Sequence, residues 1–297
     1  MAGFALWVCA TGIAGERLRV DTHLVLINAT VTDRDGHFVG GLARQDFRLY
    51  QGGQPQRIVS FSQDDAPVSV GIGFDSSGSM SASLDLAKQA LRHFLNAAGR
   101  EDEFALVVVK DRPDWALQFT REPNEVLASM SGMHADGSTA LRDAMYLALQ
   151  RMKQARHPRR ALLVVSDGLD NHSRYTDLEL MSMLRETDVT VYAIGLYRAF
   201  PDEAVLGRQL LQDMADSTGG LYLEAGGPRD LPKVIGKIDI RNEYVLGMAP
   251  AGLQADGKYH NVTLKLKRDA RTRKLRASWR RGYYAVGDIA LPKFSLR

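Results

Sequence analysis

Hydrophobic residues gather in four nearly continuous runs in the middle of the chain. These runs occupy residues 68–74, 105–109, 161–165 and 189–194. Runs without regular polar alternation are typical of strands that are covered on both faces, as in a parallel sheet. The middle of the chain is therefore predicted to contain a mostly parallel sheet whose strands are buried.

Amphipathic segments separate these runs. Residues 83–98 and 139–152 repeat apolar positions at helical spacing, and Thr176-Asp-Leu-Glu179 has the sequence of a capping box. A further helix is predicted at 206–217, followed by a short strand at 221–224. The alternation of strand and helix predicts an α/β class, with a doubly wound, Rossmann-like sheet and helices on both faces.

The two ends of the chain show the alternation of antiparallel strands. It starts at Val25 and returns at residues 244–248, 262–267 and 278–285. We expect the two ends to pair into one small antiparallel β-sandwich that the α/β domain interrupts. The predicted division is an apolar N-terminal segment at 1–17, a β-domain in two parts at 18–65 and 241–287, an α/β domain at 66–240 and a tail at 288–297.

Composition limits the classes of protein that the chain can belong to. It has 297 residues, 45% of them hydrophobic, and a net charge of +3. Its single cysteine, Cys9, excludes an internal disulfide framework and a cysteine-based zinc site. No segment reaches the roughly 18 to 20 apolar residues that span a membrane.

The N-terminal segment has two interpretations. Residues 2–14 (AGFALWVCATGIA) resemble the hydrophobic part of a secretory signal, although no Lys or Arg precedes them. The alternative is an apolar tail or strand. We expect export, to a secreted or periplasmic location, and the sequence leaves a cytoplasmic location open.

Residues 258–282 contain ten Lys and Arg against one acid, Asp269. Such a stretch can bind nucleic acid or form the solvated face of a sheet. Several of the basic residues alternate with Val262, Leu264 and Leu266, which favours the solvated face. No nucleic-acid partner is therefore expected.

Polar side chains follow two of the buried runs and open one predicted helix. The segment Asp75-Ser-Ser-Gly-Ser79 follows the first run, Ser166-Asp-Gly168 follows the third, and Asp136-Gly-Ser-Thr139 opens the helix. In open α/β sheets, ligands bind where strands end at their carboxyl edge. Five side chains are predicted to converge there: Asp75, Ser77, Ser79, Thr139 and Asp167.

This set of ligands consists of oxygen atoms alone, without His or Cys. Hard oxygen donors suit Mg²⁺ or Mn²⁺, with Ca²⁺ as a further substitute. Gly78 permits a sharp bend between Ser77 and Ser79. Because two carboxylates incompletely neutralise a divalent cation, the site should accept an anionic ligand from outside. The alternative for the first segment alone is a polar turn, and the other two loops favour the metal site.

These residues carry a resemblance. Asp75-x-Ser77-x-Ser79, followed by Thr139 and Asp167, resembles the metal-ion-dependent adhesion site (MIDAS) of von Willebrand factor type A domains. The resemblance covers about residues 66–240. The flanks "VTDRDGHFVGGLARQDFRLYQGGQPQRIVSFS" and "DGKYHNVTLKLKR" are similar to the bacterial VWFA-related acidobacterial domain proteins.

The resemblance implies a role for each residue. Ser77 and Ser79 would bind Mg²⁺ directly and Thr139 in one state, while Asp75 and Asp167 would act directly or through water. An Asp or Glu of a partner protein would complete the coordination. The surrounding residues would be Ser76, Gly78, Asp136, Gly137, Ser138, Gly168, Asp170 and His172, with Asp136 and Asp170 bracing loops and His172 lining the rim.

The expected function is a non-enzymatic, Mg²⁺-dependent protein-binding module of the adhesion type. One alternative is a Mg²⁺-dependent hydrolase or phosphotransferase with Asp75 as nucleophile. The segment lacks the second acid or base and the phosphate-holding Lys or Gly-rich loop that such chemistry needs. A serine hydrolase is disfavoured because no Gly-x-Ser-x-Gly surrounds Ser77 or Ser79. A third hypothesis is a structural scaffold whose metal only makes the loops rigid.

Overall fold

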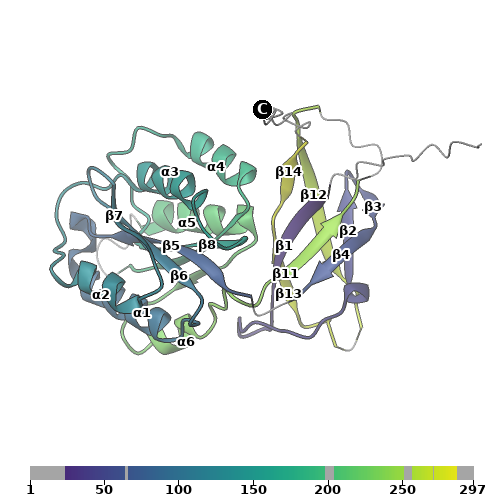
Figure 1. Ribbon diagram of the computed structural model, residues 1–297, viewed down its shortest axis with the longest axis horizontal. Helices are drawn as coiled ribbons and strands as arrows, with labels where there is room; N and C mark the ends of the chain where they lie inside the picture. The colour runs from purple at the N-terminus through teal and green to yellow at the C-terminus, as the bar shows by residue number, and fades with distance from the viewer. Residues whose placement is uncertain (1–23, 64–65, 198–203, 251–255, 270, 286–297) are drawn as a thin grey trace, which may run out of the picture.

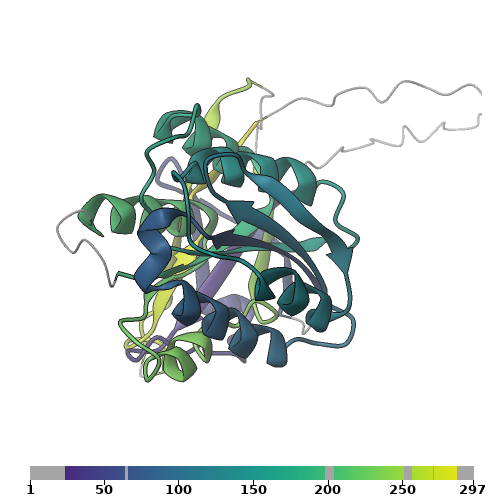
Figure 2. The same cartoon turned by 90° about the vertical axis from the view of Figure 1, so that its left-hand side faces the viewer.

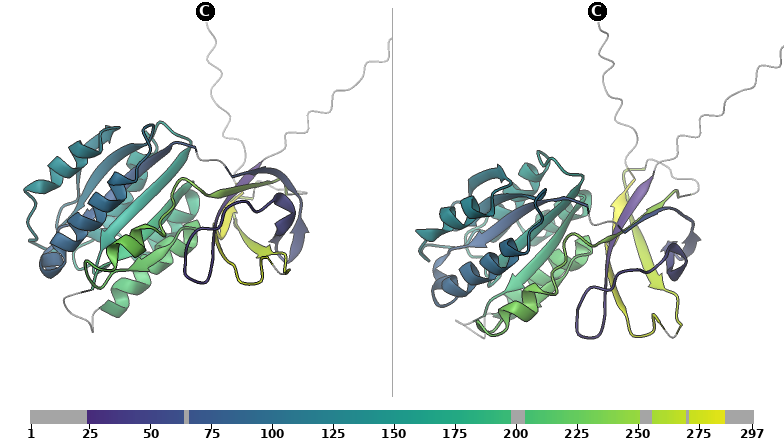
Figure 3. Two further views of the ribbon diagram at one scale, coloured as in Figure 1. Left: turned by 90° about the horizontal axis from the view of Figure 1, so that it is seen from below. Right: turned by 60° about the horizontal axis from the view of Figure 1, so that its bottom comes forward.

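Two layered parts lie side by side in the protein (Figure 1; Figure 3). The computed structural model describes residues 24–63, 66–197, 204–250, 256–269 and 271–285. One part is built on a six-stranded sheet, and the other consists of two four-stranded antiparallel sheets. The predicted α/β fold with a terminal β-sandwich is confirmed.

The six-stranded sheet has the order β10-β9-β8-β5-β6-β7. All neighbours are parallel except β6 and β7, which are antiparallel. The edge strand β7 was not among the predicted elements. The strands are β5 (Val68–Asp75), β6 (Glu103–Val109), β7 (Asp114–Thr120), β8 (Arg159–Ser166), β9 (Val189–Gly195) and β10 (Tyr222–Glu224).

Helices cover both faces of this sheet (Figure 2). One face carries α1 (Leu84–Asn96), α2 (Pro123–Ser131) and the short α6 (Leu231–Ile235). The other face carries α3 (Leu141–Met152), α4 (Asp177–Glu186) and α5 (Ala204–Thr218). The sheet is therefore doubly wound, as its uninterrupted apolar runs predicted.

Two glycines in the central strand β5 alternate with larger apolar residues and make room for helix α3. Every residue of β5 is buried. A Cβ atom at Gly71 would lie 2.9 Å from Sδ of Met152, and one at Gly73 would lie 2.7 Å from Cε of Met145. Both methionines belong to α3, so the two glycines let this helix approach the sheet closely. The loop before α3 is thereby drawn toward the end of β5.

The β-sandwich joins both ends of the chain. Its first sheet has the order β13-β1-β11-β4 and its second β14-β12-β2-β3. The pairs β1–β11 and β12–β2 link residues from opposite ends, and Ile27, Phe47, Tyr244 and Leu264 fill the space between the sheets. The strands are β1 (Val25–Thr32), β2 (Phe47–Gln51), β3 (Gln54–Gln56), β4 (Ile58–Ser62), β11 (Tyr244–Met248), β12 (Tyr259–Leu266), β13 (Arg276–Trp279) and β14 (Gly282–Tyr284).

One predicted strand is wrong. Residues 278–285 form the end of β13 and all of β14, which belong to different sheets. The chain crosses between the sheets at Arg280, whose backbone N–H donates to the carbonyl of Asn28 at 2.9 Å. Apolar alternation continues through such a crossing, because both strands face the same core. The pattern therefore did not mark the change of sheet.

Of the basic stretch, Lys265 lies within β12 on its solvated face, whereas Arg280 and Arg281 at the end of the stretch are half-buried. Val262 and Leu264 are buried, whereas Thr263 and Lys265 are exposed. This agrees with the alternation read from the sequence. No helix among the described residues is long and apolar enough to cross a membrane. The predicted N-terminal segment 1–17 and the tail 288–297 lie outside the described residues.

Buried polar contacts hold the sandwich against the α/β part. The hydroxyl of Tyr192 donates to Oε1 of Glu243 at 2.7 Å, and the Asn28 amide donates to Oε2 of Glu243 and Oγ1 of Thr190. Thr190 and Tyr192 lie in the first half of β9. The sandwich therefore lies toward the amino ends of the parallel strands, and the carboxyl edge is left open.

Candidate metal centre

Three loops meet at the carboxyl edge of the central sheet. They contain residues 75–79, 135–139 and 166–172, and backbone hydrogen bonds join them to one another. The N–H of Gly78 donates to the carbonyl of Gly137 at 3.0 Å, and the N–H of Asp136 donates to that of Ser76 at 3.0 Å. The N–H of Asn171 donates to the carbonyl of Thr139 at 3.0 Å. The structure thus brings together the three segments that the sequence singled out.

Asp75 is at the centre of this arrangement. It is the last residue of β5, and its side chain is 0% exposed. Its Oδ1 accepts hydrogen bonds from the backbone N–H of Ser77 at 2.9 Å and from the Ser77 hydroxyl at 2.7 Å. Its Oδ2 accepts one from the Ser166 hydroxyl at 2.5 Å. The Ser77 and Ser79 hydroxyl oxygens lie 3.1 Å apart.

Burial raises the pKa of Asp75 to about 6, and the nearby charge of Asp167 also raises it. The hydrogen bonds from Ser166 and Ser77 act in the opposite direction. Among the described residues, no Lys, Arg or His side chain forms an ion pair with Asp75. A buried carboxylate within a group of hydroxyls, and without a cationic partner, fits the needs of a hard divalent cation.

Thr139 and Asp167 are both buried near the same edge. Thr139 lies just before α3, and its backbone N–H donates to Oδ1 of Asn171 at 2.9 Å. Asp167 follows β8 directly, and its Oδ1 accepts the N–H of Leu169 at 3.0 Å. Each residue is therefore positioned by hydrogen bonds within its own or the neighbouring loop.

Asp170 braces the third loop through hydrogen bonds from Ser173, just after that loop, and from α3. Its Oδ2 accepts the backbone N–H of Arg142 at 2.8 Å and the Ser173 hydroxyl at 2.6 Å. Its Oδ1 lies 3.2 Å from NH1 of Arg142 in an ion pair. These contacts occupy both carboxylate oxygens, so Asp170 has a structural role in the loop.

The other surrounding residues lie in the same loops. Oδ1 of Asp136 accepts the N–H of Gly137 at 2.7 Å. The backbone N–H of Ser76 donates to the carbonyl of Val109 at 3.1 Å, and that of His172 donates to Thr139 at 2.9 Å. His172 is exposed, which places it at the rim. Ser138 is half-buried beside Thr139.

The turn at Gly168 requires glycine. Its φ is +75°, and a Cβ atom there would lie 2.3 Å from the carbonyl oxygen of Gly207. Gly207 is in the first turn of α5. This helix therefore packs directly against the Asp167 loop, a contact that the sequence analysis did not predict.

Ser166 and Asn171 make supporting hydrogen bonds that the sequence did not predict. Ser166 supports Asp75 through its hydroxyl, which also accepts the N–H of Gly168 at 2.8 Å. Asn171 links its loop to Thr139 through both its side chain and its backbone. The sequence signal for each is a polar residue next to a predicted feature. Ser166 directly follows an apolar run, and Asn171 directly follows Asp170.

Another group of potential ligands lies in the β-sandwich. Ligand atoms of Asp33, Asp35 and His37 lie within 4.8 Å of one another in a loop near the surface. Oδ1 of Asp33 accepts the backbone N–H groups of Asp35 and His37, both at 2.9 Å. The carboxylate of Asp33 thus closes a turn, which accounts for the proximity of the three residues.

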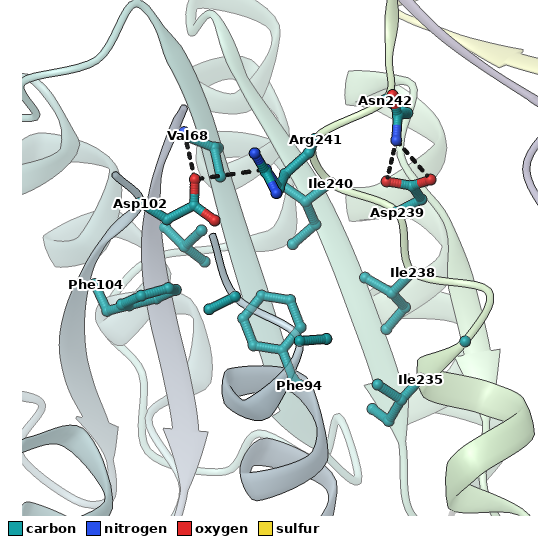
Figure 4. A pocket seen from close by; sticks show the side chains of 14 residues that line it. Val68, Phe94, Asp102, Phe104, Ile235, Ile238, Asp239, Ile240, Arg241 and Asn242 are labelled. Atoms are coloured by element: carbon teal, nitrogen blue, oxygen red, sulfur yellow. Dashed lines mark hydrogen bonds and ion pairs between the residues drawn. The ribbon is translucent and has the colours of Figure 1, made fainter. Parts of the chain in front are cut away.

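A cavity of about 330 Å³ lies at the opposite edge of the central sheet (Figure 4). Phe94, Phe104 and Ile238 line it, and Asp102 accepts the backbone N–H of Val68 at 3.1 Å. Asp102 also lies 3.7 Å from Arg241 in an ion pair. Because Val68 begins β5 and Asp75 ends it, this cavity is separate from the candidate metal centre.

Comparison with known proteins identifies the α/β part. Residues 74–169 match the family model of the von Willebrand factor type A domain, and this range contains all five candidate metal ligands. The chain therefore carries a von Willebrand factor type A domain. The comparison with curated proteins found no match.

Solved structures show the same fold. The von Willebrand factor type A protein from Catenulispora acidiphila has a TM-score of 0.50 at 13% identity, covering 90% of this chain and 74% of that one. Proximal thread matrix protein 1 from the mussel byssus, solved with a zinc-occupied MIDAS motif, has a TM-score of 0.50 at 18% identity, covering 63% and 48%. BatB from Bacteroides thetaiotaomicron has a TM-score of 0.47 at 19% identity, covering 57% and 96%. At these identities, the first two structures establish likeness of fold alone.

Proposed function

We propose that this chain is a non-enzymatic, adhesion-type module that binds a partner protein through a divalent cation. Mg²⁺ is the expected ion, with Mn²⁺ or Ca²⁺ as substitutes. The observation that carries the proposal is the environment of Asp75, a fully buried carboxylate that accepts three hydrogen bonds and has no cationic partner among the described residues. The proposed ligands, direct or through water, are Asp75, Ser77, Ser79, Thr139 and Asp167.

The chain's own residues would prepare the site. Because the Ser77 hydroxyl donates a hydrogen bond to Asp75, its oxygen faces Ser79 with one lone pair and keeps the other for a cation. If Asp75 and Asp167 act through water, the direct ligands are neutral hydroxyls, and a bound ion keeps its positive charge toward an outside ligand. A bound Mg²⁺ would supply a coordination position for an outside carboxylate. The partner is therefore proposed to be a protein that presents Asp or Glu.

The geometry argues against Asp75 as a catalytic nucleophile. Its carboxylate is 0% exposed, and both oxygens accept hydrogen bonds from serines. A substrate phosphate could reach it only by displacing these contacts. The mussel byssus structure with a zinc-occupied MIDAS motif supports the view that a domain of this fold can hold a divalent ion.

Calorimetric titration with Mg²⁺ and Mn²⁺ tests the proposal. We expect the intact protein to bind both ions and to bind them more tightly in acetate. Asp75→Ala should lose binding and Thr139→Ala should weaken it, whereas Asp35→Ala, which changes an exposed aspartate in the sandwich, should have no effect. A metal affinity that does not change when acetate is added would favour a scaffold role instead.

We further propose that the module acts outside the cytoplasm. This rests on the signal-like composition of residues 2–14, which lie outside the described residues. Fractionation of cells that express the full chain tests it: we expect the protein in the periplasm or medium, and retention in the cytoplasm would contradict it.

A further inference from the structure

We propose that the hollow between the first turns of α4 and α5 receives an apolar side chain of the partner, next to the carboxylate that the metal would hold. This inference rests on the proposed function and narrows it. The partner segment would carry an Asp or Glu with a leucine-like residue close to it in sequence. We call this place the apolar hollow; Leu169, Leu178, Met181, Leu206 and Leu210 form or border it.

Exposed apolar side chains are concentrated here. Leu178 is 83% exposed, Leu206 77% and Val205 63%, the three highest values for large apolar side chains among the described residues. All three lie in the first turn of α4 or α5. Large exposed apolar groups beside a candidate binding site mark an interaction surface more often than isolated ones do.

The two helices point their apolar residues into the same space. The hollow has a volume of about 230 Å³, and Leu169, Met181, Leu206 and Leu210 are among its lining residues. Leu178 and Met181 are three positions apart on α4, and Leu206 and Leu210 are four apart on α5, so each pair shares one helix face. Leu178 does not line the hollow itself but lies beside Asp177, which does, and so flanks the hollow on α4.

The polar groups of the hollow already have partners. Arg142 forms ion pairs with Asp170 at 3.2 Å and with Asp177 at 2.6 Å. Asp213 accepts a hydrogen bond from the Gln209 amide at 2.7 Å. Apolar surface is thus what remains uncovered, and an apolar side chain is the occupant that it favours.

The hollow adjoins the loop of the candidate metal centre that follows Asp167. Gly168 and Leu169, which follow Asp167 directly, are part of its lining. Gly207, next to Leu206, packs against the backbone of Asp167 and Gly168. A segment that brings a carboxylate to the metal therefore passes beside Leu206.

The opposite flank of the centre has different chemistry. A second hollow, of about 400 Å³, is lined there by Lys110, Asp111, Asp114, His134 and Asp136. Both hollows have charged and apolar lining residues, but the second exposes mostly polar surface and the apolar hollow mostly apolar surface. This asymmetry would fix the direction in which a partner segment crosses the metal.

Blocked tetrapeptides provide the test. The reference peptide is acetyl-Glu-Gly-Gly-Gly-amide, and in the others leucine replaces one glycine or precedes the glutamate. With Mn²⁺ present, we expect one placement of leucine to bind roughly tenfold more tightly than the reference, since burial of a leucine side chain is worth at least that factor. The same peptide should shift the methyl resonance of ¹³C-labelled Met181.

Two variants separate the hollow from the metal. Leu206→Ser should abolish the leucine advantage while Mn²⁺ and the reference peptide bind as before. Leu26→Ser removes an exposed leucine of the sandwich and should change nothing. Equal affinity for all peptides would contradict the proposed role of the apolar hollow, while the proposed binding of a carboxylate by the metal would still hold. If Mn²⁺ binds but neither acetate nor any peptide does, the proposed function fails, and this inference fails with it. If Leu206→Ser and Leu26→Ser reduce the leucine advantage equally, leucine binds to apolar surface in general. That result would contradict the proposed role of the apolar hollow.

Discussion

The hydroxyl of Ser166 donates a hydrogen bond to Oδ2 of Asp75 and so joins the carboxyl ends of the neighbouring strands β8 and β5. The same hydroxyl accepts the N–H of Gly168. Ser166 thus couples the orientation of the buried carboxylate to the turn that carries Asp167. The candidate metal centre depends on this support as well as on its proposed ligands.

Ser166→Ala should therefore weaken metal binding. Without this donor, the pKa of Asp75 should rise further. Oδ2 of its carboxylate should also lose the hydrogen bond that holds it in place. A hydrogen bond to a charged group contributes about 1.5–3 kcal/mol, so Mn²⁺ affinity should fall by roughly tenfold or more. Calorimetry measures this. Ser129→Ala, at a half-buried position on α2 away from the centre, is the control. Unchanged affinity in Ser166→Ala would show that Ser166 does not support the centre.

Asp75→Asn should stabilise the metal-free protein at neutral pH. Burial raises the folded-state pKa of Asp75 from 3.8 to about 6, so the folded state holds its proton more tightly than the unfolded state. The resulting stability is present below pH 3.8 and is lost as the pH rises through about 6. The loss corresponds to about 3 kcal/mol.

Urea unfolding in chelator from pH 4 to 8 checks this prediction. The stability of Asp75→Asn relative to the unchanged protein should grow by about 2.5 kcal/mol over the range, because the first part of the titration lies below pH 4. Taking the difference between the two proteins removes the contribution of Glu243, another buried acid whose pKa is raised by burial. A difference that does not vary with pH would contradict the pKa assigned to Asp75.

Gly168→Ala should destabilise the protein and disturb the metal centre. The left-handed φ and the close carbonyl of Gly207 both oppose a Cβ atom, so we expect a loss of about 2 kcal/mol or more. Gly132→Ala is the matched control, because its φ is −92° and nothing lies within 4 Å of the added atom. The melting temperatures of the two variants test this prediction. Equal melting temperatures would contradict the predicted steric crowding at residue 168.

Tyr192→Phe should weaken the junction with the sandwich and leave the metal centre intact. It removes the 2.7 Å hydrogen bond to the buried Glu243. The expected cost is about 1–3 kcal/mol, because a buried acceptor loses its donor. Urea unfolding measures the cost, and a calorimetric Mn²⁺ titration should show unchanged affinity. A large loss of affinity would mean that the junction and the metal centre are coupled.

Local patterns predicted most of the fold. Apolar runs located β5, β6, β8 and β9, because strands buried on both faces need apolar residues throughout. The motif spacing located the loops of Asp75, Thr139 and Asp167. The edge strand β7 was missed because it alternates exposed and half-buried residues and lacks such a run.

The remainder depended on contacts between distant residues. The packing of Gly207 against Gly168 joins the first turn of α5 to a loop that lies far from it in sequence, and no periodicity marks this contact. The change of sheet at Arg280 is set by its contact with Asn28. The apolar hollow is equally invisible in sequence, since Leu178 and Leu206 belong to separate amphipathic helices with ordinary patterns.

The most direct measurement is a crystal structure of the protein with Mn²⁺ and acetate, using the anomalous signal of manganese. We predict one anomalous peak within coordination distance, about 2.0–2.4 Å, of the hydroxyl oxygens of Ser77 and Ser79, with an acetate oxygen among its ligands. A crystal saturated with Mn²⁺ that shows no peak there, or a peak only at Asp33 and Asp35, would contradict the account.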